Sequence, residues 1–440
     1  MSAPAKRAGG VLLLYRRPIS RWFRDALTIE DHIAAFARHS RFAVHAHNTE
    51  LGYPRGLDRV RFDAIVMHYS LFGAEGPDYP FSPLFERYLD ASEGSYKVAF
   101  FHDEHTACGK RFAFLNRHRF DCVFTLLEPP EFDKVYGAYT EVPKLVSHLP
   151  GYVSESAIQA SHELTGPDAE RELDVAFRAR PLAPYMGVDD KGEMGRGFAE
   201  RAGGTGLATD IEVSDESLLP GEDWFRFMAR ARTILGVESG TSCFDLEDEV
   251  RAEYERIAAV KGAENVTVAD LRGGTLERWE NRVHYRTIGP RNFEAAAMGV
   301  CQVLFEGRYS GLMEPMRHYI PLRRDFSNFD EVVERIRDPG LRAELATNAR
   351  RDLVDSEEHS FARLIESLDE VLIAAGLAAE APADGAEAAE RALRRGAPAR
   401  AAMRLRSALA YHPAMSRALW RVSRPILRVA RAFQRARARS

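Results

Sequence analysis

The sequence predicts an α/β protein in which two parallel-sheet domains face a cleft, followed by a basic helical tail. Between Val11 and Val153, short β-rich runs alternate with helical patterns, and the alternation resumes after the polar stretch 154–171. Repeated strand, helix, strand order is typical of a parallel sheet with helices on both faces. The length of 440 residues, of which 45% are hydrophobic, suits two such domains better than one.

The first predicted domain covers residues 1–153 and contains six strands. These are the runs VLLLY at 11–15, FAVHAH at 42–47, DAIVMH at 63–68, KVAFFH at 97–102, CVFTLL at 122–127 and PKLVSH at 143–148. Ile29, Ile33 and Phe36 recur at helical spacing after the first strand. Thr28 precedes this pattern, so we expect it to cap a helix between the first two strands.

Histidines end four of these strands. They are His47, His68, His102 and His148. Ligands of open parallel sheets bind outside the carboxyl ends of the strands, so we expect these histidines to line one edge of a cleft. For each of them, a structural or solvated role is the alternative.

The strand that ends at His102 is followed directly by Asp103, Glu104 and His105. A histidine or carboxylate in this place can take a proton from a bound hydroxyl group, and His102 and Asp103 are the candidates. These residue types also bind metals, but adjacent positions at a strand end point in different directions, and no further His or Cys cluster completes a shell. The sequence therefore predicts no metal site.

The second predicted domain covers residues 154–375, and its first strand is expected at 174–179. Arg178, Arg180 and Lys191 bracket the Pro- and Gly-punctuated loop that follows. A forked guanidinium binds phosphate strongly, and the start of a helix adds backbone donors to the same anion. The basic residues around this loop therefore predict a phosphate-binding site. The alternative is a surface loop whose basic residues increase solubility.

A carboxylate follows a later strand of the same domain. A weak strand at 207–213 and an amphipathic helix at 223–232 precede the strand TILGVES at 233–239. Glu238 lies in the tight polar turn at the carboxyl end of that strand, where the cleft is expected. A carboxylate that only caps or ties the turn is the alternative. The charged, helix-prone segment 246–284 after it is interpreted as an insertion.

The segment 283–329 combines a loop, a helix with one carboxylate and a buried strand. Gly289 and Pro290 interrupt the preceding secondary structure, and a helix is expected to begin there. Asn292 can cap this helix, and Glu294 is expected in its first turn. A carboxylate there is favoured by the helix dipole and can accept hydrogen bonds from a diol held at the helix start.

The C-terminal region divides into three parts. Helical patterns at 329–337, 339–352 and 357–373 close the folded region. Residues 376–390 are interpreted as a linker, because nine of the sixteen residues from 374 to 389 are alanine.

The tail, residues 391–440, has 14 arginines and no acidic residue, which leaves a net charge of −19 for the rest of the chain. Ile426, Val429 and Phe433 recur at helical spacing, so the tail could lie on an anionic membrane surface. The alternatives are docking on an acidic face of the same protein and a disordered arm that touches nucleic acid. Aromatic residues do not interleave with the arginines, and we therefore expect no nucleic-acid partner.

Residues 294–299, Glu-Ala-Ala-Ala-Met-Gly, resemble the nucleotide-binding segment of GT-B fold glycosyltransferases, where a Glu-Ala-x-Ala-x-Gly run follows a loop under the donor sugar. The resemblance continues through Gly311, Glu314, His318, Tyr319, Pro321 and Asp325. Eight positions before Glu294, where many retaining members have a second glutamate, this chain has Arg286. The resemblance implies two Rossmann-like domains that bind a nucleotide-diphosphate sugar.

The resemblance also implies roles for individual residues. Arg180 and Lys191 match the basic pair that holds the donor pyrophosphate, and Glu294 matches the residue that binds the ribose. Donor binding is expected of Arg178, Arg180, Lys191, Gly289, Pro290, Arg291 and Glu294, and catalysis of Glu238, Asp103 and His102. No bound metal or other cofactor is implied, because the basic residues neutralise the diphosphate.

Three functions are compatible with this resemblance. The first is a glycosyltransferase that passes a sugar to a glycan or lipid-linked acceptor in polysaccharide or glycoconjugate biosynthesis. The second is a nucleotide-sugar epimerase of the same fold. The third is a catalytically silent module that binds a glycan or an assembly partner.

The sequence predicts a cytoplasmic protein, with the tail on the inner face of the cell membrane. No apolar run approaches the roughly 18 to 20 residues of a membrane-spanning helix, and the start of the chain lacks a signal-peptide core. The four cysteines have no metal-like spacing and are expected to be reduced core thiols. They are Cys108, Cys122, Cys243 and Cys301.

Overall fold

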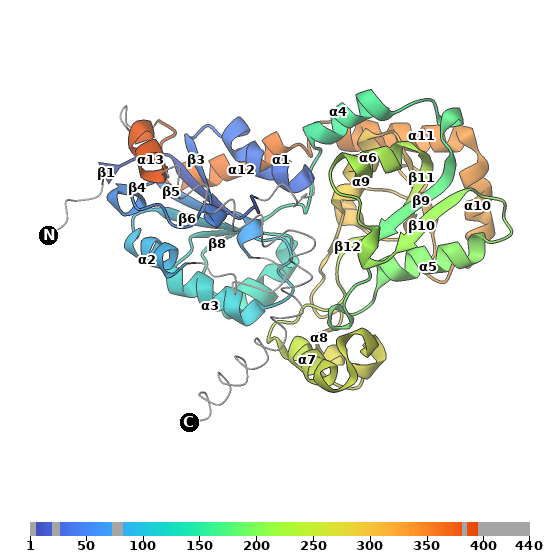
Figure 1. The fold of residues 1–440 in the computed structure, drawn as a ribbon, viewed down its shortest axis with the longest axis horizontal. Helices are drawn as coiled ribbons and strands as arrows, with labels where there is room; N and C mark the ends of the chain where they lie inside the picture. The colour runs from blue at the N-terminus through green and yellow to red at the C-terminus, as the bar shows by residue number, and fades with distance from the viewer. Residues whose placement is uncertain (1–5, 20–26, 73–81, 381–384, 395–440) are drawn as a thin grey trace.

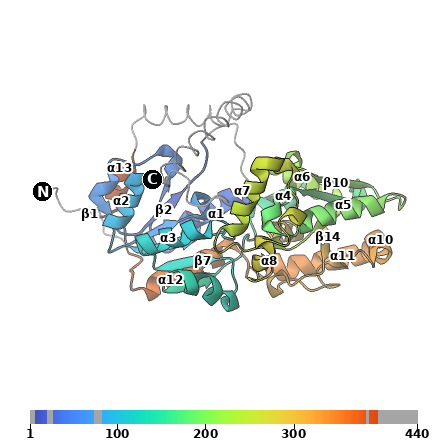
Figure 2. The same cartoon turned by 90° about the horizontal axis from the view of Figure 1, so that it is seen from below.

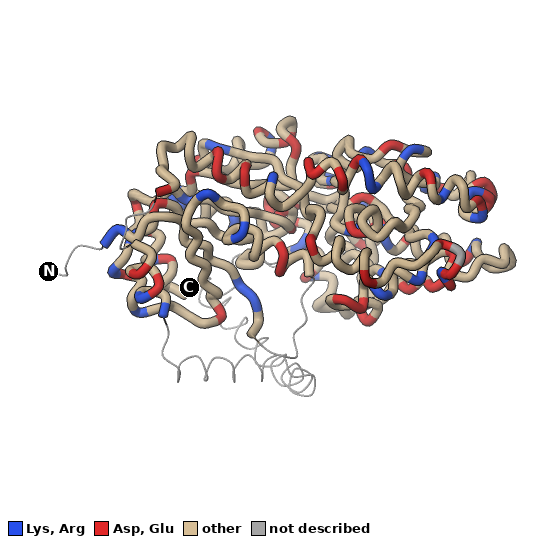
Figure 3. The backbone as a smooth tube through the Cα atoms, turned by 90° about the horizontal axis from the view of Figure 1, so that it is seen from above, with Lys and Arg blue, Asp and Glu red and all other residues tan. Residues whose placement is uncertain are grey.

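The computed structural model describes residues 6–19, 27–72, 82–380 and 385–394. Within these residues the chain forms two large parallel sheets with helices on both faces of each, together with two short two-stranded pairs (Figure 1). None of the described helices is long and apolar enough to cross a membrane. Acidic and basic residues are interspersed over both domains in the view of Figure 3. The predicted tail lies outside the described residues from position 395 onward.

The first sheet has six strands, all parallel, in the order β3-β2-β5-β6-β7-β8. Their bounds are β2 Val11–Tyr15, β3 Val44–Asn48, β5 Ala64–Met67, β6 Tyr96–Phe100, β7 Cys122–Thr125 and β8 Lys144–Ser147. A separate short pair joins β1 Lys6–Arg7 to β4 Val60–Arg61. All six strands predicted for this domain are confirmed.

Alternate residues of these strands point to opposite faces of the sheet and pack into two separate hydrophobic cores. One core packs residues such as Leu13 and Val98 against α1 and α12, and the other packs Leu12 and Ile65 against α2 and α3. The helices are α1 Leu27–His39, α2 Pro83–Ala91, α3 Cys108–His118 and α12 Phe361–Ala374. Burial on both faces explains why the central strands are continuous apolar runs. Thr28, predicted as the cap of the first helix, lies inside α1.

The second sheet has five parallel strands in the order β10-β9-β11-β14-β15. Their bounds are β9 Leu173–Ala179, β10 Thr209–Val213, β11 Ala231–Gly236, β14 Cys301–Phe305 and β15 Ile320–Leu322. The covering helices are α4 Glu155–Leu164, α5 Asp190–Ala202, α6 Glu222–Ala229, α9 Pro290–Ala297, α10 Phe329–Arg337 and α11 Pro339–Arg350. The strands predicted near 174–179, 207–213 and 233–239 are therefore present.

The end of the chain returns to the first domain, which differs from the predicted boundaries. Helix α12 lies in the core of the first sheet, where Asp369 accepts hydrogen bonds from Ser40 Oγ (2.7 Å) and Arg41 N (2.6 Å). The predicted linker 376–390 is partly helical, because α13 (Gly385–Leu393) buries Ala388 and Ala389 in the other core of that domain. An amphipathic pattern predicts a helix but not the sheet that it covers.

Two covalent connections join the domains, one leading into α4 and one leading into α12. They run side by side, because Val153 N donates to His359 O (2.9 Å) and Val153 forms a parallel bridge with Ser360. The two covalent connections between the domains therefore pass through one narrow place.

A third contact between the domains comes from the predicted insertion. Strand β12 (Ser239–Gly240) pairs with β13 (Arg286–Thr287), and between them lie α7 (Glu249–Lys261) and α8 (Thr275–Trp279). Figures 1 and 2 show α7 and α8 at the junction of the two domains. Phe244 and Trp279 pack into the core that α2 and α3 share in the first domain.

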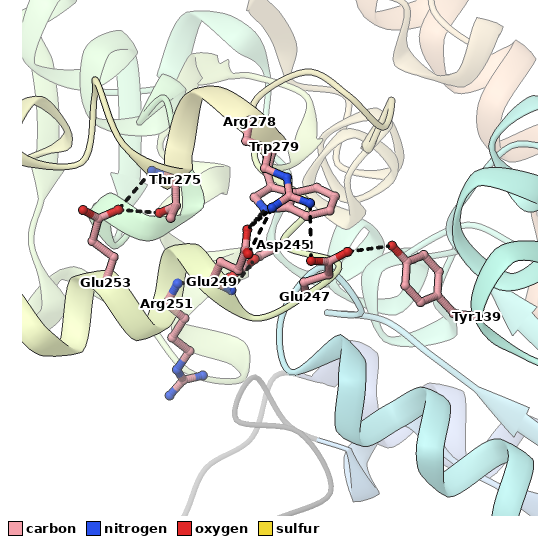
Figure 4. A network of polar contacts seen from close by, with 9 residues as sticks. All are labelled: Tyr139, Asp245, Glu247, Glu249, Arg251, Glu253, Thr275, Arg278 and Trp279. Atoms are coloured by element: carbon pink, nitrogen blue, oxygen red, sulfur yellow. Dashed lines mark hydrogen bonds and ion pairs between the residues drawn. The ribbon is translucent and has the colours of Figure 1, made fainter.

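Polar contacts hold the insertion together and tie it to the first domain (Figure 4). Glu249 accepts from Trp279 Nε1 at 3.0 Å and from Arg278, and Glu253 accepts from Thr275. Glu247 accepts from the hydroxyl of Tyr139 in the first domain at 3.5 Å.

The insertion also caps a helix of the first domain. Ala107, the cap position of α3, is in the left-handed conformation (φ 53°) and has no side chain that could satisfy the first amides. The Asp248 carboxylate does so instead, accepting from Cys108 N (2.9 Å) and Gly109 N (3.2 Å). A carboxylate at a helix start is also favoured by the helix dipole.

We predict that Asp248→Ala lowers the free energy of unfolding by about 1 to 2 kcal/mol, the usual effect of losing a helix cap. Urea unfolding measures it, and hydrogen exchange at the amides of Cys108 and Gly109 should accelerate. Glu264→Ala, an exposed carboxylate in the same insertion, is the control. Equal unfolding midpoints for the two variants would contradict the cap.

Candidate functional site

A pocket of about 440 Å³ lies at the carboxyl ends of the second sheet. This volume is in the range of small-molecule sites. Helix α1 of the first domain contributes Leu27 and Thr28. The other lining residues are Arg178, Arg180, Lys191, Leu218, Leu219, Gly221, Trp224, Phe225, Gly236, Val237, Ser239, Gly289, Pro290, Arg291, Asn292 and Glu294. Every residue expected to bind the donor therefore lines one pocket, whereas their individual roles stay predictions.

Two cations in the pocket have no anionic partner. Arg180 directly follows β9, and Lys191 is the second residue of α5, whose cap Asp189 accepts from Gly192 N at 2.9 Å. Within the described ranges, no carboxylate lies at ion-pair distance from either Arg180 or Lys191. Burial lowers the pKa of Lys191, and the charges of Arg291 and Arg180 add to this. An anion bound here would relieve that mutual repulsion.

Arg291 is held between aromatic rings. Its guanidinium lies 5.0 Å from the ring centre of Phe177 and 5.1 Å from that of Trp224, and it donates to Arg178 O at 2.6 Å. Burial lowers the pKa of Arg291 to about 10, and Glu294 opposes the shift. The pocket thus contains a third, largely desolvated cation.

Arg178 contributes to the wall of the pocket, but its charge is directed elsewhere. Its Nη2 donates to Asp210 Oδ1 at 2.6 Å, and the guanidinium stacks 4.3 Å from the ring centre of Phe227. The guanidinium is therefore already paired within the second sheet.

Glu294 is buried in the second turn of its helix, not in the first as predicted. Helix α9 begins at Pro290, and Glu294 is 8% exposed. Its Oε2 accepts from Trp224 Nε1 at 2.8 Å. Burial raises the pKa of Glu294, while the Trp224 hydrogen bond and the charge of Arg291 oppose the rise.

The cap of α9 also differs from the prediction. Gly289 occupies the cap position, and Asn292 lies within the first turn, where its Oδ1 accepts from Gly289 N at 2.9 Å. Its amide donates to Gln302 Oε1 at 2.8 Å, so Asn292 ties the helix start to β14. The predicted breakers Gly289 and Pro290 do mark the start of the helix.

Sequence reasoning missed Trp224, which reaches Glu294 from α6. The sequence predicted that Trp224 lies on the amphipathic helix 223–232, but no pattern indicated that its side chain contacts Glu294. The helical spacing of its apolar neighbours is equally typical of a core tryptophan.

Glu238 points away from the pocket and into the protein. Its Oε1 accepts from Arg308 N (3.1 Å) and Tyr309 N (2.9 Å), and the residue is 7% exposed. This geometry matches the alternative of a carboxylate that ties the turn. Its neighbours Val237 and Ser239 line the pocket, but Glu238 itself does not.

Arg286, which stands where a second glutamate was considered, forms a buried ion pair. It contacts Asp190, the first residue of α5, and Arg324 contacts the other oxygen of the same carboxylate. Asp190 is 3% exposed, so two guanidinium groups fix the start of the helix that carries Lys191.

His102 and Asp103 lie on the first-domain loop after β6. His102 Nε2 contacts Pro150 O at 3.2 Å, and its Nδ1 is 3.3 Å from Asp103 Oδ1. Burial opposes charge on His102, but the adjacent Asp103 outweighs burial and raises its pKa. Asp103 interacts electrostatically with Lys191, which relates this loop to the pocket. The Tyr285 hydroxyl donates to His102 O.

The other strand-end histidines are buried and bonded within the first domain. His47 Nε2 contacts Gly52 O (3.0 Å), His68 Nε2 contacts His32 Nδ1 (2.9 Å), and His148 Nε2 contacts Phe101 O (2.8 Å). Burial lowers the pKa of His68 to about 3 and of His148 to about 4. His47 and His68 have the structural role named as the alternative, whereas His148 also lines a pocket between the two domains, as predicted for the cleft edge.

All four cysteines are free and buried, as predicted. In the part of the chain that the structure describes, no group of three or more His, Cys, Asp or Glu residues could hold a metal ion.

We predict that His148→Gln flattens the dependence of stability on pH. Between the ordinary histidine pKa of about 6.5 and the folded value of about 4, only the unfolded state binds the proton, so stability falls as the pH falls. Each such histidine contributes about 1.4 kcal/mol per pH unit. Denaturant unfolding at several pH values within this window measures the slope, and identical slopes for the wild type and the variant would contradict the assignment.

No protein-family model and no curated protein matches the chain. Solved structures do. An α-glucosyltransferase in complex with UDP-glucose and DNA containing an abasic site is 10% identical over 84% of this chain and 100% of its own, with a TM-score of 0.48. T4 phage BGT in complex with its UDP-glucose substrate is 11% identical over 83% and 99%, with a TM-score of 0.47. Sucrose-phosphate synthase from Thermosynechococcus elongatus is 12% identical over 84% and 100%, with a TM-score of 0.43.

At these identities and TM-scores, no residue role passes from those proteins to this chain. Two parallel-sheet domains lie on either side of a pocket, and the last long helix returns to the first domain. This is the arrangement of two Rossmann-like, parallel-sheet domains facing a cleft that the sequence predicted.

Proposed function

We propose that this protein is a glycosyltransferase that moves a sugar from a nucleotide-diphosphate sugar to a glycan or lipid-linked acceptor without a bound metal. One observation carries the proposal. A single pocket combines two unpaired cations, Arg180 and Lys191, with a buried carboxylate, Glu294, on a neighbouring helix. A nucleotide diphosphate offers the matching groups, namely two phosphates and a ribose diol.

The chemistry explains why such a site needs positive charge. In sugar transfer, the bond between the anomeric carbon and the leaving phosphate oxygen breaks, and a bond from that carbon to an acceptor oxygen forms. Negative charge grows on the departing diphosphate, and preorganised cations stabilise it most where water is excluded. Arg180 and Lys191 supply this charge in the proposed mechanism, and Arg291 adds to it.

The acceptor side belongs to the first domain in this proposal. A second pocket of about 340 Å³ is lined by residues of both domains, including His148 and Glu128 from the first and Thr287 and Ser310 from the second. Its mixture of apolar and hydroxyl-bearing side chains suits a sugar ring or a polar lipid headgroup. The acceptor hydroxyl loses its proton on transfer, and Asp103 and His102 remain the candidates to receive it.

The experiment is turnover of UDP-, GDP- and TDP-sugars, with and without glycan or lipid-linked acceptors and with a chelator present. Nucleoside diphosphate released only with an acceptor supports the transferase, and unchanged rates in the chelator support metal independence. An altered donor sugar without transfer would support the epimerase instead. Binding without any turnover would support a silent module.

We predict that Arg180→Ala raises the barrier to transfer by about 2 to 4 kcal/mol, because a cation facing the leaving diphosphate is lost. Steady-state rates at saturating donor measure the effect, which corresponds to a fall of roughly 30- to 1,000-fold. Arg201→Ala removes an exposed arginine from α5, the helix that carries Lys191, and serves as the control. Full activity in Arg180→Ala would remove that residue from the mechanism.

A further inference from the structure

The contact between Trp224 and Glu294 brings together two elements that are far apart in sequence. Trp224 lies on α6 and Glu294 on α9, and both line the pocket of about 440 Å³. The indole Nε1–H donates to Glu294 Oε2 at 2.8 Å. An indole nitrogen can donate but cannot accept, so the bond favours the charged, acceptor form of the carboxylate.

The other carboxylate oxygen of Glu294, Oε1, can still accept hydrogen bonds. Among the described residues, no donor reaches Glu294 Oε1, and no guanidinium or ammonium group lies at ion-pair distance from this carboxylate. A buried carboxylate with one hydrogen bond is costly unless a further donor meets it. The pocket is where that donor can enter.

We propose that Trp224 is the positioning residue of the ribose site: it fixes one oxygen of Glu294 so that the other meets the vicinal hydroxyls of a ribonucleoside diphosphate. This inference rests on the proposed function and narrows its donor class. A 2′-deoxyribose has only one of the two hydroxyls, so the site discriminates against deoxyribonucleotide donors. The tryptophan acts through Glu294 and does not touch the reacting atoms.

The effect of the hydrogen bond between Trp224 and Glu294 can be separated from the effect of Trp224 packing against Arg291. Its guanidinium lies 5.1 Å from the ring centre of Trp224 and contacts the Phe177 ring as well. Trp224→Phe keeps an aromatic face for Arg291 but removes the N–H donor. A loss of discrimination in this variant is therefore attributable to the missing hydrogen bond.

The test is titration calorimetry of the full chain with UDP and 2′-deoxy-UDP, and with GDP and 2′-deoxy-GDP. The wild type should bind the ribo form at least about tenfold more tightly, as expected for hydrogen bonds to a charged group. Trp224→Phe should weaken binding of the ribo form by about tenfold and bring the ratio close to one.

Two further variants complete the test. Glu294→Asp shortens the carboxylate, keeps its charge and breaks the same contact, so it should lower the ratio even where Trp224→Phe folds poorly. Trp279→Phe removes the indole that donates to Glu249 in the insertion, away from the pocket, and should leave the ratio unchanged. Thermal unfolding establishes that each variant is folded.

The outcomes separate the two proposals. An unchanged ratio in folded Trp224→Phe or Glu294→Asp would overturn the role of Trp224 while leaving the proposed function intact. Equal binding of ribo and deoxy forms by the wild type would do the same. A wild type that binds no nucleoside diphosphate would overturn the proposed function and this inference with it.

Discussion

Parallel pairing of the strands is the constraint on which the rest of the structure depends. Because every strand of the two main sheets runs parallel to its neighbours, each needs a crossover, and the carboxyl ends of a sheet meet at one edge. Arg180 after β9, Ser239 after β11 and the loop before α9 therefore converge on one pocket although they are distant in sequence. The chemistry of the site follows from which side chains stand at those ends.

Much of this arrangement could be predicted from the sequence, because it depends on topology. The six apolar runs of the first domain, and the cations immediately after β9 and at the start of α5, lie where the pattern places them. Topology fixes the position of a residue along an edge. It does not fix the direction of the side chain, since that depends on neighbours contributed by other segments.

The differences between prediction and structure arise from such neighbours. Glu238 turns toward the amides of residues 308 and 309, and Arg178 turns toward Asp210, because those partners lie on adjacent elements. Trp224 could not be assigned to Glu294, since no local pattern relates α6 to α9. The affiliation of α12 with the first domain was hidden for the same reason, as its apolar face fits either sheet.

The paired connections at Val153 and Ser360 have a mechanical consequence. Two covalent links that are tied together behave as a single hinge, so one domain can rotate relative to the other with little strain in either sheet. Such a rotation would carry Leu27 and Thr28 away from the opposite wall of the pocket. The insertion restrains such a rotation, because Phe244 and Trp279 are buried in the core of the first domain and Asp248 is bonded to the amides at the start of α3.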